Sequence, residues 1–313
     1  MTDIGMITNM KRIKTIRIAT RQSKLALWQS NFVKFELEKI YPHLHIELVG
    51  ITTEGDQQQS IPLSQIGGKT NFVKALQDAL LKNEADIAVH SIKDMSVFPV
   101  EKLILAAICE RANPRDAFIS NHHLDIFSLP ENAIVGTASP RRTCLIKSMR
   151  PDLQITMLRG NVDTRLAKLD AGNYDAIILA AAGLERLGLK SCIRSYFSDE
   201  IFIPAIGQGA IGIECREDDI VMRDLLVPLH HQPTAQCVMA ERAVNQVIGG
   251  DCHTAIGAYA KMFDHQMQLS GMLGDENTGH LVRARVIGSP DDAESMGKTV
   301  GSKLLSEAST LSA

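Results

Sequence analysis

The 313-residue sequence has no apolar run that approaches the roughly 18 residues required for a membrane-spanning helix. Its N-terminal segment also lacks a long apolar stretch before a small-residue cleavage site, so it does not resemble a secretory signal. No Cys-x-x-Cys pair is present, and the six cysteines are scattered along the chain: Cys109, Cys144, Cys192, Cys215, Cys237 and Cys252. This usage is typical of reduced thiols and argues against a disulfide framework. We therefore expect a cytoplasmic protein that is not associated with a membrane.

The sequence has no strong excess of charge of one sign. Lys and Arg total 33 and Asp and Glu total 36, so the formal net charge is −3, which argues against a general nucleic-acid binder. Hydrophobic residues make up 45% and charged residues 22%, which excludes disordered and fibrous classes. The length allows two or three domains, each with a real core.

Familiar motifs for phosphates and metals are missing as well. Neither a Gly-x-Gly-x-x-Gly sequence nor a phosphate-binding loop follows any predicted strand. The histidine pairs at 122–123 and 230–231 have no partners at the spacing of metal ligands, and we interpret them as surface loop residues. The sequence therefore predicts no metal site.

Arginine is concentrated in one part of the chain. Residues 111–194 contain nine of the 17 arginines and carry a local charge of +4. A guanidinium pairs bidentately with carboxylate or phosphate, so this concentration predicts a pocket for small anions. Solvated surface charge is the alternative for any single arginine.

Apolar periodicity predicts alternating strands and helices over most of the chain. We expect strands at 15–19, 45–51, 86–90, 103–109, 133–136, 153–158 and 175–180, and helices at 24–39, 71–83, 139–149 and 162–171. In the first helix, Leu25, Trp28, Phe32 and Phe35 are expected to face inward. The alternation predicts mainly parallel sheets covered by helices. After about Pro233, a helix, a Gly-bounded loop, two strands and a closing helix around 291–305 predict a small α+β domain.

The two halves of the α/β region resemble each other. IATRQSKLALWQ followed by YPHLHIELV is similar to VGTASPRRTCLIK followed by RPDLQITML, and each places a Thr and, two or three residues later, a Ser between a strand and a helix. Two similar lobes form a cleft in many proteins, with the ligand at the carboxyl ends of the strands. Chance similarity between α/β segments is the alternative.

These Thr/Ser turns place Arg21 with Ser23, and Ser139 with Arg141 and Arg142, at predicted helix N-termini. A serine at this position is explained by helix capping alone. Arginine there is electrostatically unfavourable, because the free N–H groups and the helix dipole attract anions. We therefore expect these cations to be paired with a bound anion.

Other candidates follow predicted strands. Arg159 and Arg165 lie where a strand leads into a helix, and Lys93 and Asp94 follow the apolar segment IAVHS. Asp94 has two interpretations: a salt bridge to the other lobe, or a carboxylate that stabilises a cation or moves a proton.

Cys252 lies in the sequence GGDCH, whereas the other five cysteines fall in apolar or helical patterns typical of core residues. Three roles are open for its thiol: a nucleophile beside His253, as in a cysteine hydrolase; a tether for a prosthetic group; or a free thiol.

Taken together, these motifs resemble the porphobilinogen deaminase family. The similar segments are RIATRQSKLALWQ, GGKTNFVKAL, ADIAVHSIKD, NPRDAFIS, GTASPRR, LRGNVDTRL, YDAIILAAAGLERLG, PAIGQGAIGIECR and AERA…GGDC, in order from about Arg17 to past Gly257. The resemblance implies a transferase, hydroxymethylbilane synthase. It joins four porphobilinogen molecules with loss of ammonia, giving the linear tetrapyrrole hydroxymethylbilane in haem biosynthesis.

The same resemblance implies roles for individual residues. A dipyrromethane cofactor is expected on Cys252 through a thioether, and Asp94 matches the catalytic aspartate of the family. The residues expected to hold the carboxylates of the cofactor are Lys93, Thr137, Ser139, Arg141 and Arg142. The residues expected to bind the substrate and the growing chain are Arg21, Ser23, Lys69, Arg159, Arg165 and Arg186.

The resemblance also implies the architecture. We expect two similar α/β lobes of the periplasmic-binding-protein kind, with mainly parallel sheets, and a small α+β C-terminal domain. The predicted domains are 13–109 with 210–227, 115–204, and 232–313. Porphobilinogen is the expected small-molecule partner, and nothing in the sequence requires more than a monomer.

Some positions depart from the family pattern. Glu54 and Gln65 stand where the family commonly has basic residues, and Ala255 replaces a common proline. Asp251, beside Cys252, is expected to raise the pKa of the thiol and slow attachment of the cofactor. Two alternatives therefore accompany the active enzyme: a catalytically impaired paralogue and a small-anion binding protein of the same fold.

Overall fold

The computed structural model describes residues 14–51, 70–250 and 254–311. The chain forms two compact units: one extends to Arg111 and includes Ala210–Thr234, and the other combines Ala112–Gly209 with Ala235–Ala313.

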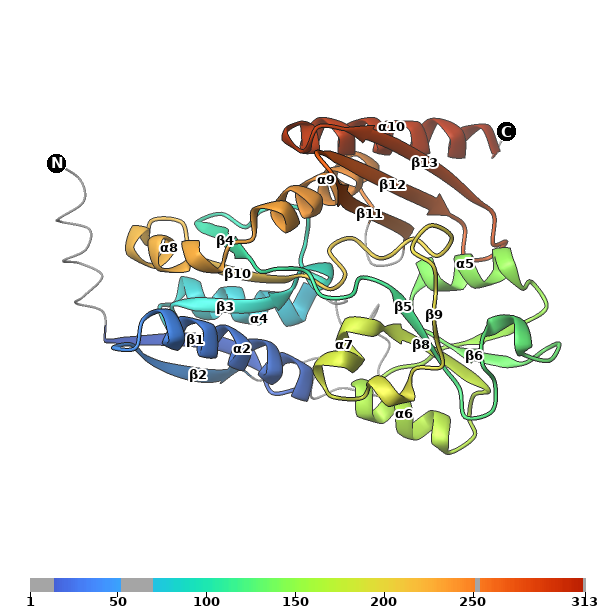
Figure 1. Ribbon diagram of the computed structural model, residues 1–313, viewed down its shortest axis with the longest axis horizontal. Helices are drawn as coiled ribbons and strands as arrows, with labels where there is room; N and C mark the ends of the chain where they lie inside the picture. The colour runs from blue at the N-terminus through green and yellow to red at the C-terminus, as the bar shows by residue number, and fades with distance from the viewer. Residues whose placement is uncertain (1–13, 52–69, 251–253, 312–313) are drawn as a thin grey trace. The chain divides into compact units, whose positions relative to one another are not determined.

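The first unit is built on a five-stranded sheet in the order β2-β1-β3-β10-β4 (Figure 1). The strands are β1 (Thr15–Arg21), β2 (His45–Ile51), β3 (Ile87–Ser91), β4 (Leu103–Ile108) and β10 (Ile211–Arg216). β1 runs parallel to both β2 and β3, whereas β10 is antiparallel to its neighbours β3 and β4. Four of the five strands therefore point the same way.

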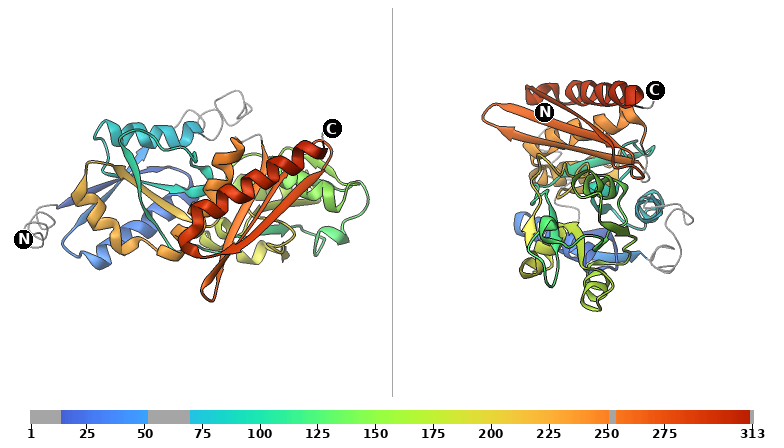
Figure 2. Two further views of the ribbon diagram at one scale, coloured as in Figure 1. Left: turned by 90° about the horizontal axis from the view of Figure 1, so that it is seen from above. Right: turned by 90° about the vertical axis from the view of Figure 1, so that its right-hand side faces the viewer.

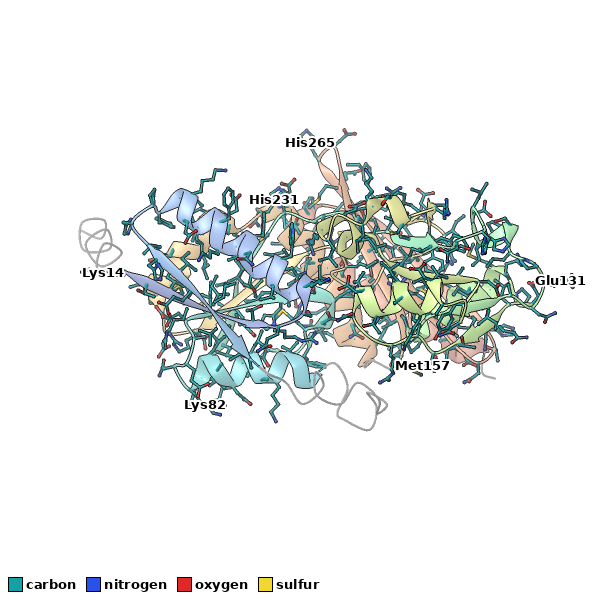
Figure 3. All side chains as sticks on the ribbon, turned by 90° about the horizontal axis from the view of Figure 1, so that it is seen from below. Lys14, Lys82, Glu131, Met157, His231 and His265 are labelled. Atoms are coloured by element: carbon teal, nitrogen blue, oxygen red, sulfur yellow. The ribbon has the colours of Figure 1, made fainter. Side chains whose placement is uncertain are left out.

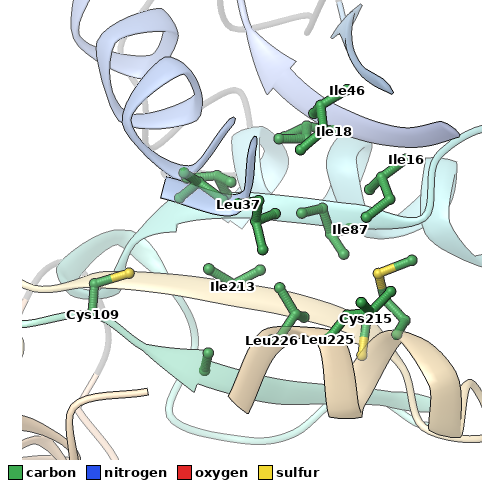
Figure 4. Packing of buried hydrophobic residues seen from close by; sticks show 14 of the residues in the cluster. Ile16, Ile18, Leu37, Ile46, Ile87, Cys109, Ile213, Cys215, Leu225 and Leu226 are labelled. Carbon is green, nitrogen blue, oxygen red and sulfur yellow. The ribbon is translucent and has the colours of Figure 1, made fainter. Parts of the chain in front are cut away.

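Helices cover both faces of this sheet. They are α2 (Lys24–Ile40), α4 (Thr70–Leu81) and α8 (Ile220–Leu226). Leu37 of α2 and Leu225 of α8 pack with Ile87 in one core cluster (Figure 4), whereas Leu76 of α4 packs with Ala88 in another. Since successive residues of a strand point to opposite faces, α2 and α8 lie on one side of β3 and α4 on the other.

The predicted inward face of α2 is wrong for Trp28 and Phe35, whereas Phe32 is partly buried and packs against the core as predicted. Trp28 and Phe35 are 36% and 63% exposed, and the buried positions of the helix are Gln29, Ser30, Val33 and Leu37. Trp28 stacks on Phe32 with ring centroids 5.7 Å apart. The polar Gln29 lies inward because its amide nitrogen donates a hydrogen bond of 2.8 Å to Oγ of Ser91 on β3.

The second unit contains a sheet of the same design, in the order β7-β6-β8-β5-β9. Its strands are β5 (Asp116–Ile119), β6 (Ile134–Gly136), β7 (Gln154–Thr156), β8 (Ala176–Ala180) and β9 (Ser195–Tyr196), with helices α5 (Pro140–Met149), α6 (Val162–Asp170) and α7 (Ala181–Arg186). β6 is parallel to β7 and β8, and β5 is antiparallel to β8 and β9. The prediction of two similar lobes with mainly parallel sheets is confirmed.

The C-terminal part of the second unit is a three-stranded antiparallel sheet with two long helices. Its elements are α9 (Gln232–Ile248), β11 (Ala255–Phe263), β12 (Gln266–Gly274), β13 (Leu281–Gly288) and α10 (Ala293–Leu311). α10 runs across this sheet, and the β11–β12 turn carries His265 away from it (Figures 2 and 3). The predicted α+β character is confirmed. β13 adds a third strand to the two expected, and its Val282 and Ala284 are buried while Arg283 and Arg285 are exposed.

Short 3-10 helices complete the fold: η2 (Ile92–Asp94), η3 (Ile126–Ser128), η4 (Lys190–Cys192), η5 (Val227–Leu229) and η6 (Pro290–Asp292).

The C-terminal sheet packs onto the second lobe, since Ala255 and Met272 share a core cluster with Leu145 of α5. The division into three domains, at 13–109 with 210–227, 115–204 and 232–313, remains a prediction. Among the residues that the structure describes, no helix combines the length and apolar character needed to cross a membrane.

Close packing of α9 and α10 depends on glycine. A Cβ atom at Gly301 would lie 2.8 Å from Cβ of Val247 and 2.9 Å from the carbonyl oxygen of Val244. We expect Gly301→Leu to lower the free energy of unfolding by about 1–3 kcal/mol, because it overpacks this contact. Ser302→Leu, on the exposed side of the same helix, is the control. Urea unfolding followed by circular dichroism measures both, and equal midpoints for the two variants would contradict the expectation.

Candidate functional site at the carboxyl edges of two parallel sheets

In the first unit, the fold brings four predicted site residues to one edge of the sheet. Arg21 is the last residue of β1, and Ser23 caps α2 by accepting a 3.4 Å hydrogen bond from N of Ala26. Lys93 and Asp94 follow β3, which is the parallel neighbour of β1. Because parallel strands end at the same edge, these residues gather there, where α/β proteins bind ligands.

The turn that carries Lys93 and Asp94 is η2. Its first residue, Ile92, is 1% exposed, and N of Ile92 donates a 3.1 Å hydrogen bond to the carbonyl oxygen of Ala210. N of Met95 closes the turn on the carbonyl oxygen of Ile92 at 3.0 Å. Lys93 and Asp94 themselves are half-buried. A buried anchor therefore presents two charged side chains at the edge of the sheet.

In the second unit, the remaining described site residues follow three adjacent parallel strands. Thr137 and Ser139 come after β6, Arg159 after β7, and Arg186 ends α7 after β8. Arg165 lies in the first turns of α6, whose N-cap is Asn161. The structure thus brings these residues to the carboxyl edge of the second sheet.

The predicted Thr-x-Ser cap of α5 is confirmed. Oγ of Ser139 accepts a 3.5 Å hydrogen bond from N of Arg142, and Oγ1 of Thr137 accepts one of 3.2 Å from N of Ser139. Pro140 occupies the first helical position, where its missing N–H costs nothing. The helix N-terminus is therefore fixed in place, with its partial positive charge at the edge of the sheet.

Arg141 and Arg142 pair with a carboxylate that the sequence analysis did not single out. Nη2 of Arg141 lies 2.8 Å from Oδ2 of Asp116, and Nη2 of Arg142 lies 2.6 Å from Oδ1. The three residues are 3%, 7% and 0% exposed, respectively for Arg141, Arg142 and Asp116. Nε2 of Gln208 also donates to Oδ1 of Asp116, at 3.3 Å. The sequence predicted a bound anion beside these arginines. The anion that both of them contact is the carboxylate of Asp116, which belongs to the chain itself.

This cluster has electrostatic consequences for its members. Burial alone would raise the pKa of Asp116, but the two guanidiniums outweigh it and hold that pKa below its usual range. Burial lowers the pKa of Arg141, and the neighbouring Arg142 lowers it further against the pull of Asp116. Two guanidiniums share one carboxylate, so the cluster formed by these described residues keeps a surplus positive charge. Nε of Arg141 is also buried without a hydrogen-bond acceptor among the described residues.

The other three predicted site arginines of the second unit, Arg159, Arg165 and Arg186, are only half-buried. Nε of Arg165 donates to the carbonyl oxygen of Gly160 at 2.7 Å, and Nη2 of Arg186 donates to that of Gly209 at 2.7 Å. Nε of Arg159 lies 3.1 Å from the sulfur of Met157. These contacts fix the orientation of the three guanidinium groups.

Several predicted site features lie outside the described residues. These are Lys69, Cys252, His253 and the departures Glu54, Gln65 and Asp251. Of the other five cysteines, all but the half-buried Cys192 are buried, as expected of core residues. The parts of the chain that are described contain no cluster of three His, Cys, Asp or Glu side chains suited to a metal ion.

Asp116 is the functional residue that sequence reasoning missed. It is 25 residues away from Arg141 in the chain and lies in the segment NPRDAFIS. The sequence did contain one signal for it. Helix α5 begins with two consecutive arginines and has no acidic residue in its first turn, which indicates that a carboxylate from elsewhere in the chain pairs with them.

Comparisons with known proteins agree on one family. The family model "Porphobilinogen deaminase, dipyromethane cofactor binding domain" matches residues 16–224, and "Porphobilinogen deaminase, C-terminal domain" matches residues 235–306. The porphobilinogen deaminases of two Coxiella burnetii strains, Dugway 5J108-111 and CbuK_Q154, are each 50% identical over 298 residues, covering 95% of this chain and 96% of theirs.

Solved structures that resemble the chain are more distant. A periplasmic substrate-binding protein of an ABC transporter from Coxiella burnetii is 13% identical, with a TM-score of 0.45 over 71% of this chain and 94% of its own. The methionine-binding protein MetQ is 14% identical, with a TM-score of 0.45 over 72% of this chain and 94% of its own.

The Asp116 cluster generates a stability prediction. Asp116→Asn leaves two buried guanidiniums without their counter-ion and is expected to lower the free energy of unfolding by about 3–5 kcal/mol. Asp152→Asn, which breaks the more exposed pair between Arg150 and Asp152, is the control and should lower the free energy of unfolding much less, because solvent screens this pair. Urea unfolding followed by circular dichroism compares the two, and similar losses would contradict the prediction.

The same measurement has a pH dependence with a definite sign. Since the pKa of Asp116 is lowered in the folded state, its stabilisation is complete above the unfolded value of about 4. It is lost as the pH falls below that value and through the folded pKa. The difference between the wild-type chain and Asp116→Asn should therefore shrink only under acid conditions.

Proposed function

The chain belongs to the porphobilinogen deaminase family and is a transferase that forms hydroxymethylbilane from porphobilinogen, and from this we propose which residues carry the reaction. Four porphobilinogen molecules are joined head to tail, and one ammonia is released for each. The proposal assigns the catalytic carboxylate to Asp94. It rests on the position of Asp94 in a tightly anchored turn at the carboxyl edge of the first sheet.

The Asp94 carboxylate has two proposed roles: it stabilises positive charge on the substrate pyrrole, and it assists the loss of a proton from the ring. When the C–N bond to the leaving ammonia breaks, positive charge develops on the substrate pyrrole. Part of this charge lies on the N–H group of the ring. A carboxylate near that N–H stabilises the charge, because it concentrates negative charge where positive charge develops. After the new C–C bond forms, the ring carbon must lose a proton, and the Asp94 carboxylate assists its departure. Lys93, next in the chain, supplies a cation for a carboxylate of the bound pyrroles.

The arginines act on the side chains of the substrate. Each porphobilinogen carries an acetate and a propionate group, so every added unit brings two negative charges. We assign these carboxylates to Arg21, Arg159, Arg165 and Arg186, with Ser23 and Lys69 assisting. Hydrogen bonds to backbone carbonyls orient Arg165 and Arg186, and a guanidinium can bind a carboxylate through two parallel hydrogen bonds.

The family implies a dipyrromethane cofactor, and the described residues fit such a group. A dipyrromethane carries four carboxylates. The Asp116 cluster holds a surplus positive charge, and Nε of Arg141 is a buried donor without an acceptor among the described residues. Beside it, the capped N-terminus of α5 favours an anion. The residues proposed to hold the cofactor are Lys93, Thr137, Ser139, Arg141 and Arg142.

Cys252 is the proposed point of attachment. When bound there through a thioether, the dipyrromethane supplies the pyrrole carbon to which the first substrate unit is joined. A thiolate suits this role because a soft sulfur nucleophile forms a stable bond to carbon. This assignment favours the tether over the hydrolase and free-thiol interpretations of Cys252.

The two alternatives from the sequence receive no support. The curated relatives, 50% identical over nearly the whole chain, are named as enzymes, and none of the comparisons favours an impaired paralogue or a plain binding protein. We further propose that the enzyme acts as a cytoplasmic monomer on a small-molecule substrate, without nucleic-acid or membrane partners.

Substitution of Asp94 tests the catalytic assignment. Asp94→Asn keeps the shape of the side chain but removes its charge and its capacity to take a proton. We expect the rate of porphobilinogen consumption to fall by about a hundredfold or more. Asp292→Asn, an exposed carboxylate in η6, is the matched control and should keep the wild-type rate. A rate for Asp94→Asn within a few-fold of wild type would refute the role.

Cys252→Ser tests the tether. A serine hydroxyl is a much weaker nucleophile than a thiolate, so the variant should carry no covalent pigment. An intact mass spectrum of the wild-type protein should show a surplus equal to two linked pyrrole units, located on the Cys252 peptide. The control Cys192→Ser replaces a half-buried thiol and should keep the surplus. A surplus retained in Cys252→Ser would exclude this attachment point.

A further inference from the structure

Beneath the Asp94 turn lies a cluster of polar side chains that the proposed mechanism does not use. Nε2 of His90 lies 3.2 Å from Oε2 of Glu214, and both side chains are almost completely buried, 3% and 6% exposed. Nε2 of Gln77 donates to both carboxylate oxygens of Glu214, at 3.0 and 3.1 Å. The cluster therefore joins three elements of the first unit: β3, β10 and α4.

The sheet register explains why these side chains meet. Ala88 pairs with Glu214 across the β3–β10 ladder, and His90 pairs with Gly212. Ala88 packs on the α4 side of the sheet, so His90, two residues further along the strand, points to the same side. Gln77 completes the cluster from α4. The contact between Nε2 of His90 and Oε2 of Glu214 is close, but it does not meet the geometry of a hydrogen bond.

His90 is placed to control the turn that bears Asp94. It is the second-to-last residue of β3, and Ser91 after it is held from the opposite face by Gln29 of α2. The next residue, Ile92, is fixed by the backbone bond to Ala210. The end of β3 is thus held from both faces before the chain turns to Asp94. An error of about 1 Å in a reacting group is enough to cost about a hundredfold in rate.

The second unit contains a counterpart. Its antiparallel strand β5 occupies the place in the sheet that β10 has in the first unit, and it too supplies a buried carboxylate, Asp116, to residues near the carboxyl edge. A buried charge of this kind is costly to maintain unless the surrounding groups satisfy it.

We propose that His90, Glu214 and Gln77 form a positioning network that sets the Lys93–Asp94 turn for catalysis. The proposal rests on the assignment of Asp94 as the catalytic carboxylate. None of the three residues is assigned contact with the substrate; they act through the backbone of β3 and η2.

A set of variants separates positioning from stability. His90→Leu should lower kcat by about tenfold to a hundredfold with KM within twofold, since substrate binding is assigned to other residues. His90→Gln keeps an N–H donor near the position of Nε2 and should recover most of kcat. Gln77→Leu alters the half-buried member of the network, so it supplies a second test should His90→Leu not fold.

The double variant His90→Leu/Glu214→Leu gives the decisive comparison. Replacing both members of a buried pair with apolar groups can restore stability. The proposal expects the urea midpoint to recover while kcat stays low. If kcat recovers together with the midpoint, the cluster is only structural and the proposal is overturned.

Asp86→Asn is the matched control. Asp86 pairs with Arg17 at 2.8 Å at the opposite end of β3, far along the strand from the Asp94 turn. It should lower the urea midpoint but keep kcat. An equal loss of kcat in Asp86→Asn would show that any destabilisation of the first unit suffices, which would overturn the network.

The catalytic role of Asp94 and the positioning role of the His90 network are refuted by different results. If Asp94→Asn keeps the wild-type rate, the catalytic assignment fails, whatever the His90 variants do. If Asp94→Asn is inactive and His90→Leu keeps kcat, only the positioning network fails. Intact mass confirms in each case that the variant carries its cofactor, so that a loss of rate is not a loss of loading.

Discussion

The second unit depends on one buried carboxylate. Asp116 is fully buried and is paired with both Arg141 and Arg142, which open α5. Nη1 of Arg141 reaches the carbonyl oxygen of Ile203, and Nη1 of Arg142 reaches that of Ile178 on β8. The start of α5, the strand β8 and the segment leading toward β10 are therefore held together around this charge. Since α5 also packs against the C-terminal sheet, the constraint reaches every layer of the unit.

The placement of the functional residues follows from strand direction. In each unit three adjacent strands run parallel, so the turns after them gather at one edge, although they are far apart in the sequence. Helices that begin at this edge add their N-terminal partial charge to that of the arginines. Both effects favour anions, which suits a substrate that brings two carboxylates with each unit added. The fold thus supplies the electrostatic environment, and in our proposal single residues such as Asp94 supply the chemistry.

Local patterns predicted most of the lobes and part of the site. Apolar periodicity and turn residues were sufficient for the parallel strands, and the Thr/Ser turns correctly marked Ser23 and Ser139 as helix caps. The same reasoning failed for Trp28, because hydrophobic periodicity does not detect that Gln29 is satisfied by a partner on another element. Asp116 was not predicted for a similar reason, since even the nearer of its two arginine partners, Arg141, is 25 residues away in the sequence. A local sequence pattern does not reveal which distant residues form hydrogen bonds or ion pairs with a polar side chain. The predictions were wrong or incomplete at such side chains.

The antiparallel strand of each lobe has a distinct function in this arrangement. β5 and β10 hold equivalent positions in their sheets, and each contributes a buried carboxylate, Asp116 or Glu214. The two carboxylates differ in what surrounds them. Asp116 faces two guanidiniums, so its cluster keeps a surplus positive charge that a further anion neutralises. Glu214 faces one imidazole and one amide, a set that satisfies its oxygens without adding a permanent cation. The first arrangement suits a site that must attract carboxylates, and the second suits a site that must hold a carboxylate of its own in place.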